Sequence, residues 1–263
     1  MAEITDGLDA EFHDGIARIT IRRPERKNAV THAMWRALAD HVNRCAGDDG
    51  VRVMILSGDG ADFSAGADIG EFEAVRRDAE TARAYEMANS DAFASLRHAP
   101  FPVISAISGI CFGGGFGLAA ACDLRVATPD AVFAVPAARL GLAYPQDAMI
   151  DIVTAAGTQM AKWLTFSAAR ITAAQALAAG FLLEIEADRP ALQARTTAMA
   201  ETIADNAPLS VRASKAAIHA AASKADSDAA LAQKLGAITF DSADYAEGRA
   251  AFREKRRPVF KGR

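Results

Sequence analysis

The sequence predicts an α/β fold in which a sheet built from β-α-β units is followed by an α-helical C-terminal region. Three observations lead to this expectation. Short apolar runs typical of buried strands alternate with amphipathic stretches in the first part of the chain. From Asp188 onward the patterns are helical, with no strand between them. The composition shifts near residue 200, which predicts a core over residues 1–200 and a helical region over residues 201–263.

The first half of the chain supplies most of the expected strands. Residues 15–21 alternate apolar and polar side chains, as a half-buried strand does. Thr31 can cap a helix that runs to about Cys45. The charged segment 71–83 has little apolar periodicity and suits a mobile flap. The other elements expected here are a helix at 81–97 and strands at 51–56, 103–107, 123–127 and 131–134.

The second half is predicted to be mainly helical. Pro145 suits the first turn of a helix that reaches about Ala156, and a second helical stretch covers 158–166. Thr172 and Gln175 have the spacing of a capping box, and this helix ends at Gly180. A short strand at 182–185 precedes four further helices, expected at about 189–205, 208–223, 227–240 and 242–253.

The first candidate for a functional site is the glycine run in segment 108–123, S-G-I-C-F-G-G-G-F-G-L-A-A-A-C-D. It lies between a buried strand and an alanine-rich helix, where free N–H groups and the helix dipole favour negative charge. Gly115, Gly117 and Ala120 also fit the G-x-G-x-x-A dinucleotide fingerprint, with Asp130 as the acidic residue on the next strand. The alternative is an oxyanion hole, which needs a second N–H from elsewhere.

A second loop of small residues favours the oxyanion hole. The segment 62–69, D-F-S-A-G-A-D-I, directly follows the expected strand 51–56. It could supply the second N–H group that the oxyanion hole requires. An ordinary tight turn would have the same composition, so the loop alone does not decide between the two chemistries.

Several motifs, taken together and in this order, resemble the enoyl-CoA hydratase/isomerase (crotonase) superfamily over essentially the whole chain. They are R-P at 23–24 with N-A at 28–29, F-S-A-G-A-D at 63–68, F-P-V-I-S-A-I-S-G at 101–109 before the glycine run, A-C-D-L-R-V-A at 121–127 and A-F-R-E-K-R-R-P-V-F at 251–260. The resemblance implies a β-β-α spiral core with a C-terminal helical trimerisation region. The resemblance also favours an oxyanion hole over a dinucleotide-binding site at the glycine run.

The resemblance implies a site for an acyl-CoA thioester. The N–H groups of Ala67 and Gly114 would form the oxyanion hole around the thioester carbonyl. Residues matching Phe252 and Lys255 would reach the CoA of an adjacent active site, and the assembly would be a homotrimer or a dimer of trimers. The remaining CoA-binding positions implied are Lys27, Ala65, Asp68 and Ile69. Coenzyme A enters as part of the substrate, and no separate cofactor is expected.

This chain lacks glutamate at the two positions where hydratases of the family carry their acid/base residues. Hydratases of this family use two glutamates to orient water and shuttle its proton. The matched positions hold Gly117, where the pattern G-G-G-x-E ends, and Ala137, where P-E would stand. Neither residue transfers protons, so the usual hydratase mechanism is in doubt.

The segment 140–147, L-G-L-A-Y-P-Q-D, holds the replacement candidates. Its Leu-Gly-x-x-Tyr spacing is similar to that of methylmalonyl-CoA decarboxylases, in which case Tyr144 would bind a departing carboxylate. Tyr144 could equally pack against the pocket wall with its hydroxyl bonded to the backbone. Asp147 could act as a general base, or it could only stabilise a helix start through the helix dipole.

Three functions remain open from the sequence. The first is hydration or isomerisation of an enoyl-CoA with displaced catalytic groups. The second is decarboxylation or another oxyanion-hole reaction that uses Tyr144 or Asp147. The third is plain binding of a CoA thioester without catalysis.

Composition excludes several other classes. The net charge is −4 over 263 residues, which argues against nucleic acid as a partner. The start M-A-E-I-T-D is polar and acidic, unlike a secretory signal, and no apolar segment is long enough for a membrane span. Three cysteines without metal-ligand spacing suit a reducing cytoplasm. No metal site is expected, because the histidines are scattered at positions 13, 32, 41, 98 and 219.

Overall fold

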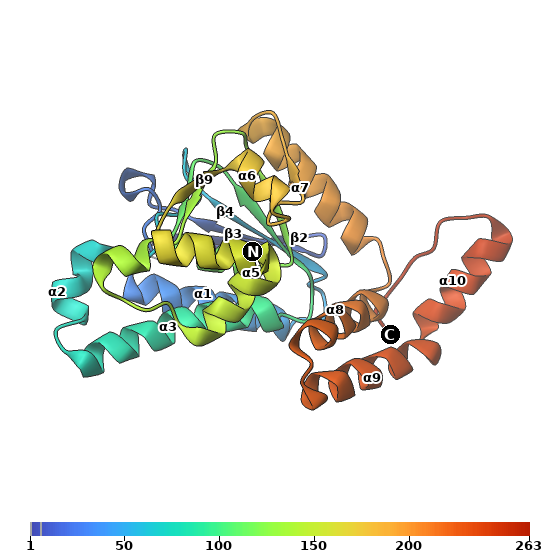
Figure 1. Ribbon diagram of the computed structural model, residues 1–263. Coiled ribbons are helices and arrows are strands. Elements are labelled where there is room, and N and C mark those ends of the chain that lie inside the picture. Colours follow the sequence, from blue (N-terminus) through green and yellow to red (C-terminus); the bar gives the residue numbers. More distant parts are fainter. Residues whose placement is uncertain (1, 6) are drawn as a thin grey trace.

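Two sheets form the core of the computed structural model, which describes residues 2–5 and 7–263 and the side chains from Gly7 onward (Figure 1). The larger sheet is antiparallel at its N-terminal edge and parallel beyond it. Its strand order is β1 (Ala2–Thr5), β2 (Leu8–His13), β3 (Ile16–Ile21), β4 (Val53–Gly58), β5 (Val103–Ile107), β7 (Leu124–Ala127) and β10 (Glu184–Ile185). The smaller sheet has the order β6 (Ile110–Phe112), β8 (Val132–Ala134) and β9 (Arg170–Thr172).

From β5 to β8, successive strands alternate between the two sheets, as the expected β-β-α spiral requires. After β5 in the large sheet come β6 in the small sheet and helix α4 (Gly114–Ala121). After β7 and β8 come a short 3-10 helix (Pro136–Leu140) and α5 (Gln146–Ser167). Segments distant in sequence become neighbours in this arrangement: Ser64, after β4, pairs with Cys111 of β6, and Val30 pairs with Ala67.

Helices cover both faces of the large sheet, and strand β4 shows how. Val53 and Ile55 pack toward α7 (Arg189–Ala204), whereas Met54 and Leu56 pack into the larger cluster on the opposite face. This alternation follows from the two-residue period of a strand. The opposite face is covered by α1 (His32–Ala46), α3 (Ala79–His98) and α5 (Figure 1). The site therefore rests on a sheet that is buried on both sides.

Side-chain caps begin several helices where the sequence predicted them. The Thr31 hydroxyl accepts a hydrogen bond from the Met34 N–H, and Thr172 with Gln175 forms the predicted capping box of α6 (Ala173–Ala178). Asp78 and Thr81 form a further capping box at α3. Segment 71–83, expected to suit a flap, contains the short helix α2 (Phe72–Val75) and the start of α3.

The C-terminal helices extend away from the sheets (Figure 1). They are α8 (Pro208–Ser223), α9 (Asp226–Phe240) and α10 (Ala243–Glu254), each within one residue of its predicted bounds. Large apolar side chains are exposed along them: Ile218, Leu231, Ile238, Phe240 and Phe252. The boundary placed at residue 200 stays a prediction; α7, which packs on the sheet, continues to Ala204.

Some elements were not anticipated from the sequence. The hairpin β1–β2 joins the sheet as its N-terminal edge, and β6 and β9 are three-residue strands of the small sheet. Helix α5 spans both of the helical stretches expected around position 157, where Gly157 has a φ of +75° and bends the helix. Among the described residues, no helix is both long and apolar enough to cross a bilayer, and no three His, Cys, Asp or Glu side chains gather as metal ligands.

Candidate functional site

Two glycine-containing loops meet at the start of α4. Gly66, with a φ of +88°, lies so close to the second loop that a Cβ there would be 2.6 Å from the Phe112 carbonyl oxygen and 2.7 Å from the Gly114 nitrogen. On the second loop, a Cβ at Gly115 would be 2.4 Å from the Ser64 carbonyl oxygen. These separations are too short for any side chain. The glycines are therefore required for the two loops to approach each other.

Two backbone N–H groups have no partner among the described residues where the loops meet. Gly114 is the first residue of α4, where a helical N–H has no partner within the helix. Ala67 sits between the bonded pairs Val30 N–H to Gly66 O and Asp68 N–H to Val30 O, and its own N–H donates to no described residue. A Cβ at Gly114 would lie 3.5 Å from the Ala67 nitrogen, so the two N–H groups are neighbours. Two neighbouring N–H donors are one requirement of an oxyanion hole.

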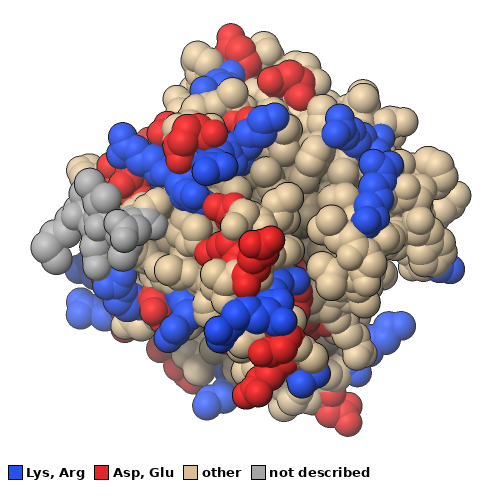
Figure 2. Space-filling model, turned by 90° about the vertical axis from the view of Figure 1, so that its left-hand side faces the viewer, with Lys and Arg blue, Asp and Glu red and all other residues tan. Residues whose placement is uncertain are grey.

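The free N–H groups lie on the wall of a cavity of about 630 Å³. Its mainly apolar lining comes from the two loops on one side, from α2 and the middle of α3, and from the segment that leads into α5. Figure 2 views the molecule from the α2 side, where Lys and Arg side chains gather in several groups with Asp and Glu between them. The basic residues that line the cavity itself are Arg26, Arg76 and Arg139. Arg26 and Arg139 suit a ligand that carries phosphates, whereas the charge of Arg76 is paired with that of Glu86.

Most of the CoA-contacting positions expected on the first loop line this cavity, namely Ala65, Ala67, Asp68 and Ile69. Lys27 does not line it; this exposed residue has a φ of +52°, and its carbonyl accepts the Ala65 N–H. Its neighbour Arg26 lines the cavity instead. Lysine and arginine both suit a phosphate, and the sequence did not show which of the adjacent side chains faces inward.

Asp68 holds the first loop to segment 23–29. Its Oδ2 accepts a hydrogen bond from Arg23 Nη1 at 2.9 Å, and Arg23 Nη1 also donates to the Ala29 carbonyl oxygen. Burial alone would raise the pKa of the Asp68 carboxyl. The hydrogen bonds from Arg23 and from the Gly70 N–H outweigh this effect, so its pKa falls below 3.8.

Asp68→Asn is expected to make the free energy of unfolding less dependent on pH below about pH 3.8. A carboxyl with a lowered folded-state pKa stabilises the protein above its unfolded pKa, and it loses this contribution as the pH falls from about 3.8 through the folded value. Urea unfolding of wild type and variant at a series of pH values measures the difference. Equal slopes below pH 3.8 in the two proteins would contradict the assignment of this carboxyl.

Tyr144 occupies the space next to Gly117. A Cβ at Gly117 would be 2.5 Å from the Tyr144 hydroxyl oxygen and 2.7 Å from Phe93 Cζ. The hydroxyl donates a hydrogen bond to the Gly113 carbonyl oxygen at 2.8 Å, and Tyr144 lines the cavity. Burial, reinforced by the nearby Cys111 and Glu86, raises its pKa well above the usual range. At neutral pH this group is therefore a neutral hydrogen-bond donor and not a base.

Gly117→Ala is expected to lower the free energy of unfolding by about 2 kcal/mol, the usual cost of overpacking a core. The added methyl group would collide with the Tyr144 hydroxyl and the Phe93 ring. The same change in a Tyr144→Ala background should cost less, because one of the two colliding groups is gone. Urea denaturation of the four proteins in this mutant cycle gives the coupling energy. A coupling of zero would show that Tyr144 does not fill this space.

The structure separates Asp147 from the cavity. It lies in the first turn of α5, where its Oδ1 accepts a hydrogen bond from the Ser90 hydroxyl at 3.3 Å, and it is absent from the cavity lining. Ala137 does line the cavity, so the second position expected to carry a glutamate faces the ligand space without a carboxylate.

The sequence did not single out three polar side chains that line the cavity, Arg76, Glu86 and Asn89. They come from the charged segment after α2 and from α3, which carries no distinctive motif. The sequence shows that Glu86 and Asn89 are spaced as on one face of a helix, but it does not show which face of α3 lines the cavity. They are the polar groups on the wall formed by α3.

Phe252 and Lys255 lie far from the cavity of their own chain. Both belong to the end of α10, at the opposite side of the molecule from α2 (Figure 1). Phe252 is 86% exposed, and Lys255 ends α10 with a φ of +55°. Any contact of these residues with a cavity would involve another copy of the chain.

The cysteines lack the features of a nucleophile. Cys111 lies in β6 and is fully buried, and this burial raises the pKa of its thiol well above the usual value. Burial also raises the pKa of Cys122 to about 12. Both thiols therefore stay protonated at neutral pH.

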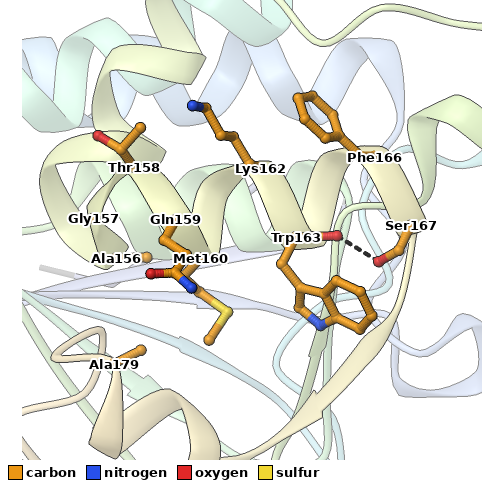
Figure 3. Close-up of a pocket in the computed structure, with 10 residues that line it drawn as sticks. All are labelled: Ala156, Gly157, Thr158, Gln159, Met160, Lys162, Trp163, Phe166, Ser167 and Ala179. Atoms are coloured by element: carbon orange, nitrogen blue, oxygen red, sulfur yellow. Dashed lines mark hydrogen bonds between the residues drawn. The ribbon is translucent and has the colours of Figure 1, made fainter.

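A second hollow, of about 900 Å³, lies over the part of α5 that follows Gly157 (Figure 3). Trp163 and Met160 lie on one side of the helix in this view, and Lys162 and Phe166 on the other. Lys162 is the single titratable side chain in its lining. Because the described residues of its lining include neither a carboxylate nor a histidine, this hollow is a less suitable reaction site than the smaller cavity.

Comparison with known proteins adds independent information. The family model described as enoyl-CoA hydratase/isomerase matches residues 11–263. The chain is 34% identical to the mitochondrial enoyl-CoA hydratase domain-containing protein 2 of Bos taurus, over 95% of this chain and 86% of that protein. It is 30% identical to the mitochondrial Delta(3,5)-Delta(2,4)-dienoyl-CoA isomerase of Mus musculus, over 76% of this chain and 64% of that protein. The crystal structure of an enoyl-CoA hydratase/carnithine racemase from Magnetospirillum magneticum superposes with a TM-score of 0.91 at 33% identity, covering 100% of this chain and 97% of that one.

Proposed function

Because this chain belongs to the enoyl-CoA hydratase/isomerase family, we propose that it binds an acyl-CoA thioester and stabilises the thioester enolate through the N–H groups of Ala67 and Gly114. The observation that carries the proposal is the pair of neighbouring, unbonded N–H groups on the wall of a cavity of about 630 Å³. Preorganised donors of this kind bind the anionic oxygen of an enolate more strongly than the neutral carbonyl.

Hydration or isomerisation of an enoyl-CoA is the first reaction we assign to this site. Both reactions pass through a thioester enolate, and both need groups that move a proton at the α or γ carbon. Gly117 and Ala137 cannot do this. The carboxylates on the cavity wall are Asp68, which is bonded to Arg23, and Glu86, which is bonded to Arg76.

Decarboxylation of a malonyl-type CoA ester is the second candidate, and the position of Tyr144 favours it. Cleavage of the C–C bond releases carbon dioxide and leaves its electron pair on the α carbon as the enolate, so no base is required in that step. Tyr144 lies on the cavity wall as a neutral phenol whose single O–H donates to the Gly113 carbonyl oxygen, so binding the departing carboxylate would require the hydroxyl to exchange that acceptor for a carboxylate oxygen. The enolate is then protonated to give the acyl-CoA product.

The deciding experiment is turnover of crotonyl-CoA and methylmalonyl-CoA by the purified protein. Loss of the absorbance of the conjugated thioester reports hydration, and release of carbon dioxide reports decarboxylation. Activity on either ester supports catalysis at this site and identifies the reaction. If neither ester is turned over, calorimetric titration with butyryl-CoA shows whether the chain is a thioester-binding protein. Absence of binding to every CoA ester would overturn the proposal.

We also propose that the chain assembles as a homotrimer or a dimer of trimers through its C-terminal helices. The exposed apolar side chains of α8 to α10 support this proposal, because such surface is commonly buried in an interface. Within the assembly, Phe252 and Lys255 would reach the CoA bound to another copy. Sedimentation equilibrium gives the mass of the particle directly, and a monomeric mass would contradict the assembly.

A further inference from the structure

Arg76, Glu86 and Asn89 form a polar group on one wall of the otherwise mainly apolar cavity. Glu86, Asn89 and Phe93 are three and four residues apart on α3, so they share one helical face. Phe93 touches the position of Gly117 beside the glycine turn. With a rise of 1.5 Å per residue, Asn89 lies about 6 Å and Glu86 about 10 Å further along α3 from Phe93. The polar group is therefore within reach of an acyl chain whose thioester sits at the glycine turn.

The hydrogen-bonding capacity of this group is not used up by the protein. Asn89 is only 7% exposed, and its Oδ1 atom is buried with no hydrogen-bond partner in the part of the chain that the structure describes. A 180° rotation of the amide exchanges its oxygen and nitrogen at almost constant shape, so Asn89 can present either a donor or an acceptor to the cavity.

Arg76 holds Glu86 in place. The guanidinium packs against the rings of both Phe72 and Tyr85, at 4.3 and 4.2 Å from their centroids. Its Nη2 donates to Glu86 Oε1 at 2.5 Å, while its side chain is 8% exposed and its Nε has no partner among the described residues. The positive and negative charges compensate each other. The pair therefore offers no net charge with which to attract a carboxylate.

We propose that this polar group selects acyl chains that carry an uncharged hydroxyl. The hydroxyl donates to the Glu86 carboxylate and accepts a hydrogen bond from the Asn89 amide, while Arg76 positions Glu86. A plain aliphatic chain would make neither of these hydrogen bonds, and Glu86 would keep only its bond to Arg76. A site built around such hydrogen bonds discriminates against the analogue that lacks them. The inference rests on the proposed binding of acyl-CoA thioesters and adds the class of acyl group.

Binding of saturated thioesters tests the inference without any need for turnover. The probes are hexanoyl-CoA, the three isomers with a hydroxyl at carbon 4, 5 or 6, and adipyl-CoA, which ends in a carboxylate. Isothermal titration calorimetry on the wild-type protein should give a dissociation constant about tenfold lower for at least one hydroxy isomer than for hexanoyl-CoA. Equal affinities for all uncharged esters, or tightest binding of adipyl-CoA, would overturn the inference.

Three variants connect the preference to the named residues. Asn89→Leu, of similar size, should abolish the preference for the hydroxy ester while hexanoyl-CoA binds within about threefold of its wild-type affinity. Glu86→Gln keeps the shape and should reduce the preference, which provides a second test if Asn89→Leu does not fold. Asp91→Asn, an exposed change on the same helix outside the cavity lining, should leave all affinities unchanged.

The outcomes separate the two proposals. If hexanoyl-CoA binds and the hydroxyl adds nothing, the acyl-group inference is wrong and the thioester site stands. Retained discrimination in a folded Asn89→Leu protein would also remove the inference. If neither hexanoyl-CoA nor any of its derivatives binds, the proposed function itself is wrong, and the inference fails with it.

Discussion

Gly114→Pro is expected to lower kcat at least a hundredfold on whichever thioester the protein turns over. Proline has no N–H, so the change deletes one of the two donors to the enolate oxygen, and loss of one such donor costs about a hundredfold to a thousandfold in rate. Proline is tolerated at the first position of a helix, which is where Gly114 stands in α4. The rate is measured under saturating substrate, and affinity for butyryl-CoA is measured alongside.

Gly114→Ala is the matched control for this change. Alanine adds the same Cβ, which would lie 2.9 Å from the Trp35 ring, but it keeps the N–H group. The difference in kcat between the two variants therefore isolates the donor from the steric effect. If the folded proline variant were as active as the alanine variant, the Gly114 N–H would have no part in the reaction.

Asp151→Ala is expected to lower the free energy of unfolding by about 3–5 kcal/mol, the cost of leaving a buried charge without its partner. Asp151 on α5 is 4% exposed at its side chain and accepts a hydrogen bond at 2.5 Å from Arg97 on α3, whose side chain is 14% exposed. The pair joins the helix that carries Glu86 and Asn89 to the helix that follows Tyr144. Urea unfolding at a fixed protein concentration measures the loss.

Two comparisons identify the cause of this destabilisation. Glu184→Ala breaks the exposed pair with Arg195, which has a similar separation of 2.7 Å, and should cost no more than about 1 kcal/mol because water screens it. Replacing both buried partners, as Arg97→Met with Asp151→Leu, should recover most of the loss because no buried charge remains. A double variant as unstable as Asp151→Ala would point to packing as the cause.

The sequence predicted local structure well wherever short-range signals decide it. The C-terminal helices were placed within one residue, since caps and prolines such as Pro208 and Ser242 define their ends. The resemblance drawn from the ordered motifs is confirmed by the family match over residues 11–263. By contrast, β6 and β9 are three residues long and become strands only by pairing with β8. No local sequence pattern therefore predicts them.

The candidate site was also predicted in part from the sequence and in part decided by tertiary contacts. The chain by itself determined that two loops of small residues follow strands, that glycine and alanine stand at positions 117 and 137, and that Tyr144 precedes a helix. Only the tertiary structure decided that Tyr144 fills the space beside Gly117, that Asp147 faces away, and that the α3 wall carries Glu86 and Asn89. The physical reason is that a motif specifies backbone conformation over a few residues. Which side chains share a cavity depends on how helices rotate and pack on the sheet, a property of contacts between residues distant in sequence.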